Sequence, residues 1–155
     1  MKPDFMSILQ TPWGDFGIYA GMEGITEIRY HPEQTDMPPV PYDLKHAWNA
    51  YETGLSDSLH LPLDLTAEPQ VQLLHLAVRS IPRGETRELT DVIRGTELTL
   101  EAAQEALDAC PLPLAIPLHR VLQYRGLPEE VCRAIRQFEA EHPRLPKPEI
   151  PWIKK

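Results

Sequence analysis

The segment Pro111–Arg120 restricts the fold more than any other stretch of the chain. It reads Pro-Leu-Pro-Leu-Ala-Ile-Pro-Leu-His-Arg, so prolines alternate with aliphatic residues. Proline fixes its own φ, removes a backbone donor and pushes the preceding residue towards extended backbone. We therefore expect a stiff, extended and buried segment that ends in a histidine and an arginine. His119 carries the side chain best suited to proton transfer near neutral pH, but its neighbour Leu118 offers no nucleophile.

The size and charge of the chain limit the classes of function. With 155 residues, of which 42% are hydrophobic, the chain suits one compact domain or two small ones that share a core. The net charge is −8, and residues 1–66 hold 3 Lys and Arg against 10 Asp and Glu. Residues 67–155 hold 12 against 13. Neither part has the basic excess that drives nucleic-acid binding.

The two cysteines, Cys110 and Cys132, form no pattern typical of a disulfide framework or a zinc site. The sequence contains no charged leader followed by an apolar run, and no stretch of about 20 apolar residues. We therefore expect a cytoplasmic, soluble and reduced protein that is monomeric, without a membrane segment, a metal or another cofactor.

The first part of the chain predicts a small antiparallel sheet and one helix. Alternating residues indicate strands at 5–10, 16–20 and 25–30, with turns at Thr11–Gly14 and Glu23-Gly24. A proline-rich loop covers 31–41, and the spacing of apolar residues predicts a helix over 44–51 that ends at Gly54. The apolar stretch 59–65 predicts an edge strand.

From Glu68 the apolar residues follow a helical period. The pattern predicts a helix up to Ile81, a short helix that ends at Gly95, and a helix over 100–109 capped by Thr99. These short helices and their glycine-containing turn are compatible with a helix-turn-helix. A last helix is predicted over 129–142, followed by an extended tail anchored by Trp152. The fold class is thus α/β, with a sheet domain at 1–66, a helical domain at 67–142 and a proline-rich tail at 143–155.

The order of these pieces resembles the O6-alkylguanine-DNA alkyltransferases and their cysteine-less relatives, the alkyltransferase-like proteins. Two motifs carry the resemblance: Ile81-Pro-Arg-Gly-Glu-Thr86 matches the start of the family's helix-turn-helix, and Ile116–Val121 matches its signature in all but one position. The resemblance covers nearly the whole chain. It implies a small ribonuclease-H-like sheet domain followed by a helical DNA-binding domain.

In that family a cysteine accepts an alkyl group from a flipped-out guanine, a histidine helps to generate its thiolate, and a glutamate orients the histidine. The resemblance places His119 at the histidine and Glu141 at the glutamate. The nucleophile position is Leu118, so alkyl transfer to that position is chemically excluded. We therefore expect no enzymatic activity of this kind.

Other base-handling residues of the family are missing too. Cys110 occupies the place of the family's hinge asparagine, Glu101 that of its arginine finger, and Leu89 that of the tyrosine that rotates the nucleotide. The loop that closes the guanine pocket is reduced to Gln123–Pro128. The simplest interpretation is that Leu118 is a core leucine, and that His119 is a structural histidine bonded to the backbone or to Glu141.

Two functions remain open at this point. The resemblance implies a non-catalytic DNA-repair protein that binds alkylated DNA, but the expected recognition helix carries carboxylates and no Lys or Arg. Weak contact with duplex DNA would rely on a basic edge of five arginines: Arg83, Arg87, Arg94, Arg120 and Arg125. The alternative is a protein-interaction module that no longer binds DNA, with the acidic surface or the tail as its contact. A third alternative, an enzyme that uses Cys110 or Cys132, has the least support.

Overall fold

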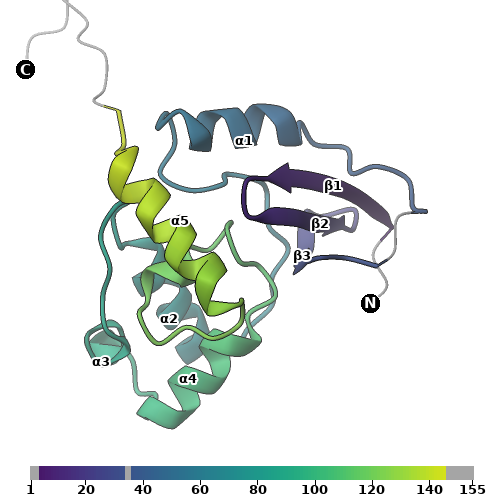
Figure 1. The fold of residues 1–155 in the computed structure, drawn as a ribbon. Coiled ribbons are helices and arrows are strands. Elements are labelled where there is room, and N and C mark those ends of the chain that lie inside the picture. The colour runs from purple at the N-terminus through teal and green to yellow at the C-terminus, as the bar shows by residue number, and fades with distance from the viewer. Residues whose placement is uncertain (1–3, 34–35, 146–155) are drawn as a thin grey trace, which may run out of the picture.

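The computed structural model describes residues 4–33 and 36–145. Strands β1 (Phe5–Thr11), β2 (Gly14–Ala20) and β3 (Ile25–Tyr30) form one antiparallel sheet in the order β1-β2-β3. Figure 1 shows helix α1 (Leu44–Glu52) beside the sheet and the remaining helices gathered on its other side. The predicted α/β class is confirmed. Trp152 and most of the predicted tail lie outside the described residues.

The helical part contains four α-helices and two short 3-10 turns within the described residues. Their bounds are α2 (Pro69–Arg79), α3 (Leu89–Val92), η1 (Ile93–Gly95), α4 (Leu100–Ala109), η2 (Leu118–Arg120) and α5 (Glu129–Glu141). The Thr99 side chain caps α4 by accepting a hydrogen bond from the Ala102 N–H. The predicted helices are therefore confirmed to within one or two residues at most ends.

The stretch 59–65 does not form the predicted edge strand. It makes one parallel bridge, between Leu63 and Ile25, in which the Ile25 N–H donates to the Pro62 carbonyl and the Asp64 N–H donates to the Ile25 carbonyl. Alternation of apolar residues predicts extended backbone, but a strand also needs a partner over its whole length. Here the stretch pairs with β3 only at the bridge between Leu63 and Ile25.

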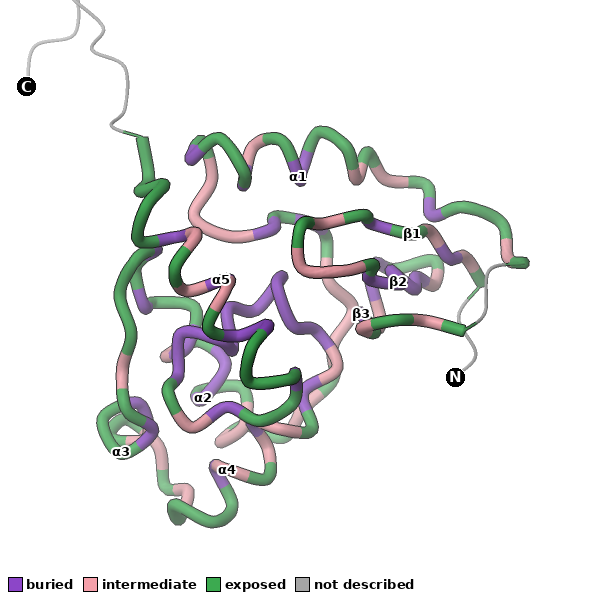
Figure 2. The backbone as a smooth tube through the Cα atoms, viewed as in Figure 1, coloured by how far each residue is buried: buried purple, intermediate pink, exposed green. Residues whose placement is uncertain are grey.

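One hydrophobic core runs through both parts of the chain. It includes Phe16 and Ile18 of the sheet, Leu74 and Leu107 of the helices, and Ile116 and Leu118 of the central segment. Figure 2 shows the buried backbone gathered in the middle of the molecule, where the central segment passes between α5 and α2. The segment 112–121 is buried throughout. The expectation of a buried central segment is confirmed.

An aromatic cluster joins the β1–β2 hairpin to α1 and α5. Trp13 packs edge-on against Trp48 at 5.7 Å and against Phe138 at 5.5 Å between ring centroids. The Tyr30 hydroxyl donates to the Trp13 carbonyl over 2.7 Å and holds the hairpin in place. Edge-to-face pairs of this kind add about 0.5–1.5 kcal/mol beyond the burial of their surface. The cluster thus fixes how the sheet meets the last helix.

We predict that Gly54→Ala lowers the free energy of unfolding by about 1–3 kcal/mol, because Gly54 has a φ of +86° that other residues adopt only with strain. An added Cβ would also lie 2.7 Å from the Pro143 carbonyl oxygen. Urea denaturation measures the change.

The matched control is Gly95→Ala, where an added Cβ meets no atom within 4 Å. We expect this variant to be as stable as the parent chain or more stable by up to about 1 kcal/mol. Equal losses in both variants would contradict the argument from φ.

Candidate functional site

The central segment delivers three consecutive side chains to the middle of the core. The Leu114 residue adopts a φ of +73°, and the chain then turns through Pro117 into η2, where the Arg120 N–H donates to the Pro117 carbonyl over 3.0 Å. Within this turn Leu118, His119 and Arg120 are all buried. The geometry of a single tight turn therefore decides where Leu118, His119 and Arg120 point.

Leu118 has no exposed surface. It belongs to the same core cluster as Tyr124 and Leu127 of the following loop and Ile135 of α5. Full burial of a leucine side chain is worth about 1.5–3 kcal/mol. The interpretation of Leu118 as a core residue agrees with this burial.

His119 meets a glutamate, but not the one expected. Its Nε2 lies 2.9 Å from Glu139 Oε1. Glu139 is 1% exposed, whereas Glu141 is exposed and accepts a hydrogen bond from Gln137. The assignment of Glu141 as the partner of His119 is therefore wrong. Glu139 follows Ile135 by four residues and shares its buried helix face, while Glu141 lies well round the helix.

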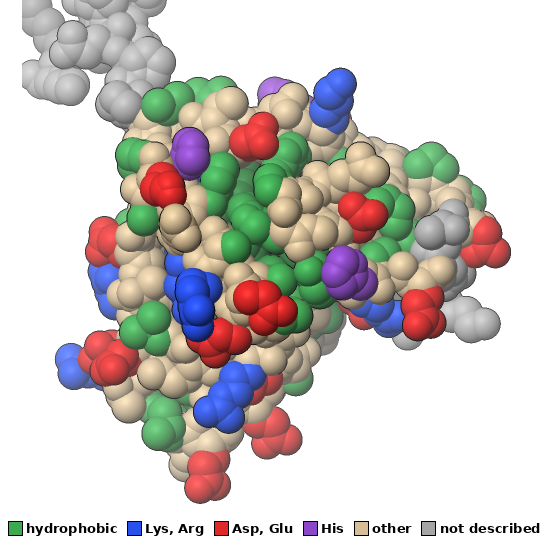
Figure 3. Space-filling view, in the orientation of Figure 1, with side chains coloured by type: hydrophobic (Ala, Val, Ile, Leu, Met, Phe, Trp, Pro, Cys, Tyr) green, Lys and Arg blue, Asp and Glu red, His purple; other side chains and the backbone are tan. Residues whose placement is uncertain are grey.

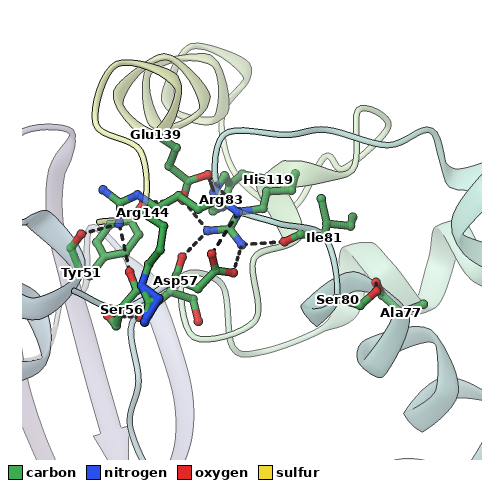
Figure 4. Close-up of polar contacts among 12 residues, drawn as sticks. Tyr51, Ser56, Asp57, Ala77, Ser80, Ile81, Arg83, His119, Glu139 and Arg144 are labelled. Atoms are coloured by element: carbon green, nitrogen blue, oxygen red, sulfur yellow. Dashed lines mark hydrogen bonds and ion pairs between the residues drawn. The ribbon is translucent and has the colours of Figure 1, made fainter. Parts of the chain in front are cut away.

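Arg120 makes the main ion pair of the core. Its guanidinium donates to both carboxylate oxygens of Glu139, over 3.0 Å and 2.9 Å, and to Asp57 Oδ2 over 3.0 Å. It also donates to the carbonyls of Ile81, over 2.9 Å, and of Asp57. Figure 4 shows Glu139 reaching from α5 towards this network while Asp57 approaches from the loop after α1. One side chain thus joins the central segment, α5 and the amino-terminal part.

Arg83 and Tyr51 extend the same network. The Tyr51 hydroxyl donates to Glu139 Oε2 over 2.6 Å, and the Arg83 guanidinium lies 4.6 Å above the Tyr51 ring. Arg83 also donates to the carbonyls of Tyr51, Ser56 and His142. These bonds tie the end of α1 and the end of α5 to the turn that precedes α3.

Burial and pairing set the protonation states within the network. Burial lowers the pKa of His119, and the nearby carboxylate only partly offsets this, so the imidazole is neutral near pH 7. Burial opposes the ionisation of Glu139, but its contacts with His119 and Arg120 outweigh it and hold its pKa well below the usual range. Burial and the adjacent Glu139 raise the pKa of Tyr51, so the phenol keeps its proton and donates. The network holds a charged Arg120–Glu139 pair, to which the neutral Tyr51 hydroxyl donates a hydrogen bond.

Neither cysteine is placed to react. Cys110 ends α4 and Cys132 lies on α5, and both side chains are buried. Burial raises the pKa of each thiol, which lowers the fraction of nucleophilic thiolate. Within the described residues there is also no group of three or more side chains able to hold a metal ion. The site has the form of a packed core.

The predicted basic edge is only partly present. Arg83 and Arg120 are buried and bound to carbonyls and carboxylates, so they are not available to DNA and their assignment as contacts is wrong. Leu89 is buried as well, with its N–H bonded to Gln123 Oε1 over 2.7 Å. An arginine in a sequence looks the same whether it is solvated or paired in the core, and the burial of these two depends on distant partners.

Three arginines and one glutamate of the predicted surface do lie outside the core. Arg87 pairs with Glu85 at 2.8 Å, Arg94 pairs with Asp91 at 3.1 Å, and Arg125 is exposed. Glu101 is exposed in the first turn of α4. On the face drawn in Figure 3, Lys and Arg side chains stand among Asp and Glu side chains and do not merge into one patch.

The short loop after the central segment is fastened to α4. Gln104 Nε2 donates to the Gln123 carbonyl over 2.8 Å, and the Arg125 N–H donates to Asp108 Oδ1 over 2.8 Å. Tyr124 and Leu127 of this loop are buried in the core cluster. Residues that the resemblance associates with a base pocket therefore form a closed, hydrogen-bonded surface. No local sequence pattern predicts this closure, because it depends on pairs 17 and 19 residues apart.

Solved structures of known proteins share this fold. The fold is similar to that of the Mycobacterium tuberculosis O6-methylguanine methyltransferase, with a TM-score of 0.71, 21% identity and coverage of 90% of this chain and 94% of that chain. It is also similar to the Mycobacterium tuberculosis OGT in complex with DNA, with a TM-score of 0.68, 22% identity and coverage of 90% and 95%. The chain has the O6-methylguanine methyltransferase fold. The predicted resemblance is confirmed at that level.

The chain is also similar in sequence to a DNA base-flipping protein. The DNA base-flipping protein of Thermus thermophilus is 38% identical over 85 residues, which are 54% of this chain. The match covers 58% of the length of that relative, somewhat less than two thirds. No family model matches the chain. Among the described residues, no helix is long and apolar enough to cross a membrane.

We predict that Glu139→Gln lowers the free energy of unfolding by about 3–5 kcal/mol, because it leaves the buried Arg120 without its main counter-ion. The matched control on the same helix is Glu141→Gln, whose side chain is exposed, and we expect a change within about 0.5 kcal/mol. Chemical denaturation of both variants distinguishes them. If the two variants were equally stable, the network would not hold the fold as described.

We also predict that stability falls as the pH is lowered from about 7. Because burial lowers the pKa of His119, the unfolded chain binds a proton below its ordinary value of 6.5 that the folded chain does not. Below 4.5 the unfolded chain also protonates Glu139, whose folded pKa is depressed, so a second loss adds to the first. Denaturation between pH 7.5 and pH 3.5 measures both. The lower step should vanish in Glu139→Gln, and a stability that rises on acidification would contradict the assignment.

Proposed function

We propose that this chain is a non-catalytic relative of the O6-alkylguanine-DNA alkyltransferases that contacts DNA without accepting an alkyl group. One observation carries the proposal: the side chain at the nucleophile position is Leu118, and it is fully buried. A leucine offers no lone pair to attack an alkyl carbon. The buried thiols of Cys110 and Cys132, with their raised pKa values, do not replace it.

The support for DNA as the partner comes from the relatives. One is named a DNA base-flipping protein, and a structure with the same fold is an OGT in complex with DNA. In this chain the corresponding surface would be the helix-turn-helix of α3 and α4, with Arg87, Arg94 and Arg125 near the phosphates. Two of these arginines pair with neighbouring carboxylates, so the gain from counterion release is small and the contact is weak.

We infer that this contact does not distinguish alkylated from normal duplex. Flipping a base costs a few kcal/mol, which a pocket and an inserted side chain must offset. Here Glu101 takes the place of the inserted arginine, and the loop that would form the pocket is bonded to Gln104 and Asp108. The base-handling steps of the family are therefore not supported by this geometry.

A second candidate is a protein-interaction module that no longer binds DNA. The acidic surface of α4 favours it, since Glu97, Glu101 and Glu105 are all exposed. Carboxylates close to phosphates in water cost on the order of 1 kcal/mol for each close pair, whereas they would suit a basic protein surface.

A fluorescence titration with duplex DNA, with and without O6-methylguanine, tests the proposal. We expect micromolar binding to both duplexes at about 50 mM salt, a loss of roughly tenfold at about 200 mM salt because few phosphates are neutralised, and no methyl adduct by mass spectrometry. Replacing Glu101 by lysine removes a repulsion and should tighten binding by about 1 kcal/mol, roughly fivefold. The control Glu23→Lys makes the same charge change in the β2–β3 turn and should alter binding far less.

A different experimental result would contradict each part of the proposal. Absence of binding at micromolar protein and about 50 mM salt would favour the interaction module. A methyl adduct on either cysteine would overturn the non-catalytic assignment. Leu118→Cys should remain inactive, because the new thiol would be buried and the pocket loop closed. Recovered alkyl transfer would show that a nucleophile alone restores the reaction.

A further inference from the structure

The rest of the chain covers the outer edge of β3 with more backbone hydrogen bonds than the outer edge of β1. The outer edge of β3 is covered: the Ile25 N–H donates to the Pro62 carbonyl and the Ile28 N–H donates to the Pro111 carbonyl. Along β1 the accompanying segment makes one backbone bond, from the Met6 N–H to the Pro38 carbonyl over 2.7 Å. The Val40 N–H donates to the Ser7 side-chain hydroxyl and not to the backbone of β1, and the chain then leaves the edge towards α1.

The alternation of a strand shows which groups this leaves unpaired. Since the Met6 N–H points away from β2, the backbone groups of Ile8 and Gln10 point the same way, and those of Ser7 and Leu9 face β2. Among the described residues, no hydrogen bond outside the sheet reaches the backbone of Ile8 or Gln10. Two further rungs of the edge are therefore open.

A groove of about 780 Å³ lies along these open rungs, between β1 and α1. Figure 1 shows the two elements running side by side. Its walls include Ile8 and Gln10 of the edge, Val40 and Tyr42 of the loop, and Leu44 and Trp48 of α1. This volume lies within the range of roughly 300–1,000 Å³ typical of ligand clefts.

The composition of β1 is unusual for an exposed edge. Strands at sheet edges are commonly protected from pairing by charged residues or proline, but Phe5–Thr11 contains neither. The opposite edge strand, β3, carries Glu27 and Arg29. Ile8 is 39% exposed in the middle of β1. The edge is thus both unpaired and unprotected.

We propose that this groove binds an extended peptide segment of a partner protein, which adds to the sheet as a fourth strand beside β1. Backbone N–H and C=O groups of the peptide would pair with Ile8 and Gln10, as in recognition by strand addition. Alternate side chains would face Tyr42 and Trp48, so they are apolar. Among the described residues that line the groove, Lys45 is the one cation, and it selects an acidic residue in the peptide. The Asp43 carboxylate is already engaged by the His46 N–H.

This inference does not rest on the proposed DNA contact, because the groove belongs to the sheet and the DNA surface to α3 and α4. The test is a selection of random seven-residue peptides displayed on phage against the full chain. We expect enriched sequences that alternate apolar residues and carry an acidic residue. A labelled synthetic copy of the enriched peptide then gives the affinity by fluorescence anisotropy.

Ile8→Pro removes an N–H that the sheet does not use, so the β1–β2 ladder should survive while the peptide loses a rung. We expect at least tenfold weaker binding, against near-normal binding by the matched control Ile8→Thr. Lys45→Glu should weaken the acidic peptide more than its amide analogue. A peptide methylated on alternate backbone nitrogens should fail to bind the unchanged protein, which tests the pairing even if Ile8→Pro does not fold.

Three outcomes would overturn the proposal. These are a selection without enriched sequences, a peptide whose affinity survives both Ile8→Pro and backbone methylation, and a concentration-dependent dimer that Ile8→Pro abolishes. The last would show that the edge pairs with a second copy of this chain.

Discussion

The buried pair of Arg120 and Glu139 is the interaction on which the rest of the structure depends. Removing two charges from water costs several kcal/mol per ion, and good geometry with further hydrogen bonds is needed to offset it. Here the Glu139 carboxylate accepts hydrogen bonds from two guanidinium nitrogens of Arg120 and from the Tyr51 hydroxyl, and it contacts His119. The guanidinium also donates to Asp57 and to the Ile81 carbonyl. The central segment, α5 and the amino-terminal part are held in one arrangement by these bonds.

This network supports the proposed function, because it shows how the O6-methylguanine methyltransferase fold can be held together without a nucleophile at position 118. The resemblance assigns a histidine and a glutamate to the generation of a thiolate, but in this chain His119 and Glu139 belong to a set of contacts that the core requires. Removing a nucleophile leaves those contacts intact, whereas removing Glu139 would leave a buried charge unpaired. Leu118 fills its position with apolar atoms and makes the packing continuous.

Much of the fold could be predicted from local patterns, and the errors in the site have two causes. The period of apolar residues predicted the strands and helices to within a few residues, because amphipathic spacing and caps such as Thr99 act over one or two turns. The prediction of Glu141 as the partner of His119 is wrong because it rests on the resemblance, whereas the buried face of α5 that Ile135 marks carries Glu139. The predicted surface positions of Arg83 and Arg120 are wrong because sequence alone does not reveal a partner 32 or 63 residues away.

The sequence by itself determined that position 118 offers no nucleophile, since a leucine has no reactive atom in any conformation. It also determined the order and type of the elements, which depend on neighbouring residues. Only the tertiary structure decided that Glu139 pairs with Arg120, that the loop around Tyr124 closes onto α4, and that the edge of β1 stays open beside α1. These features depend on groups distant in the chain meeting at hydrogen-bond distance, and no local pattern encodes such a meeting.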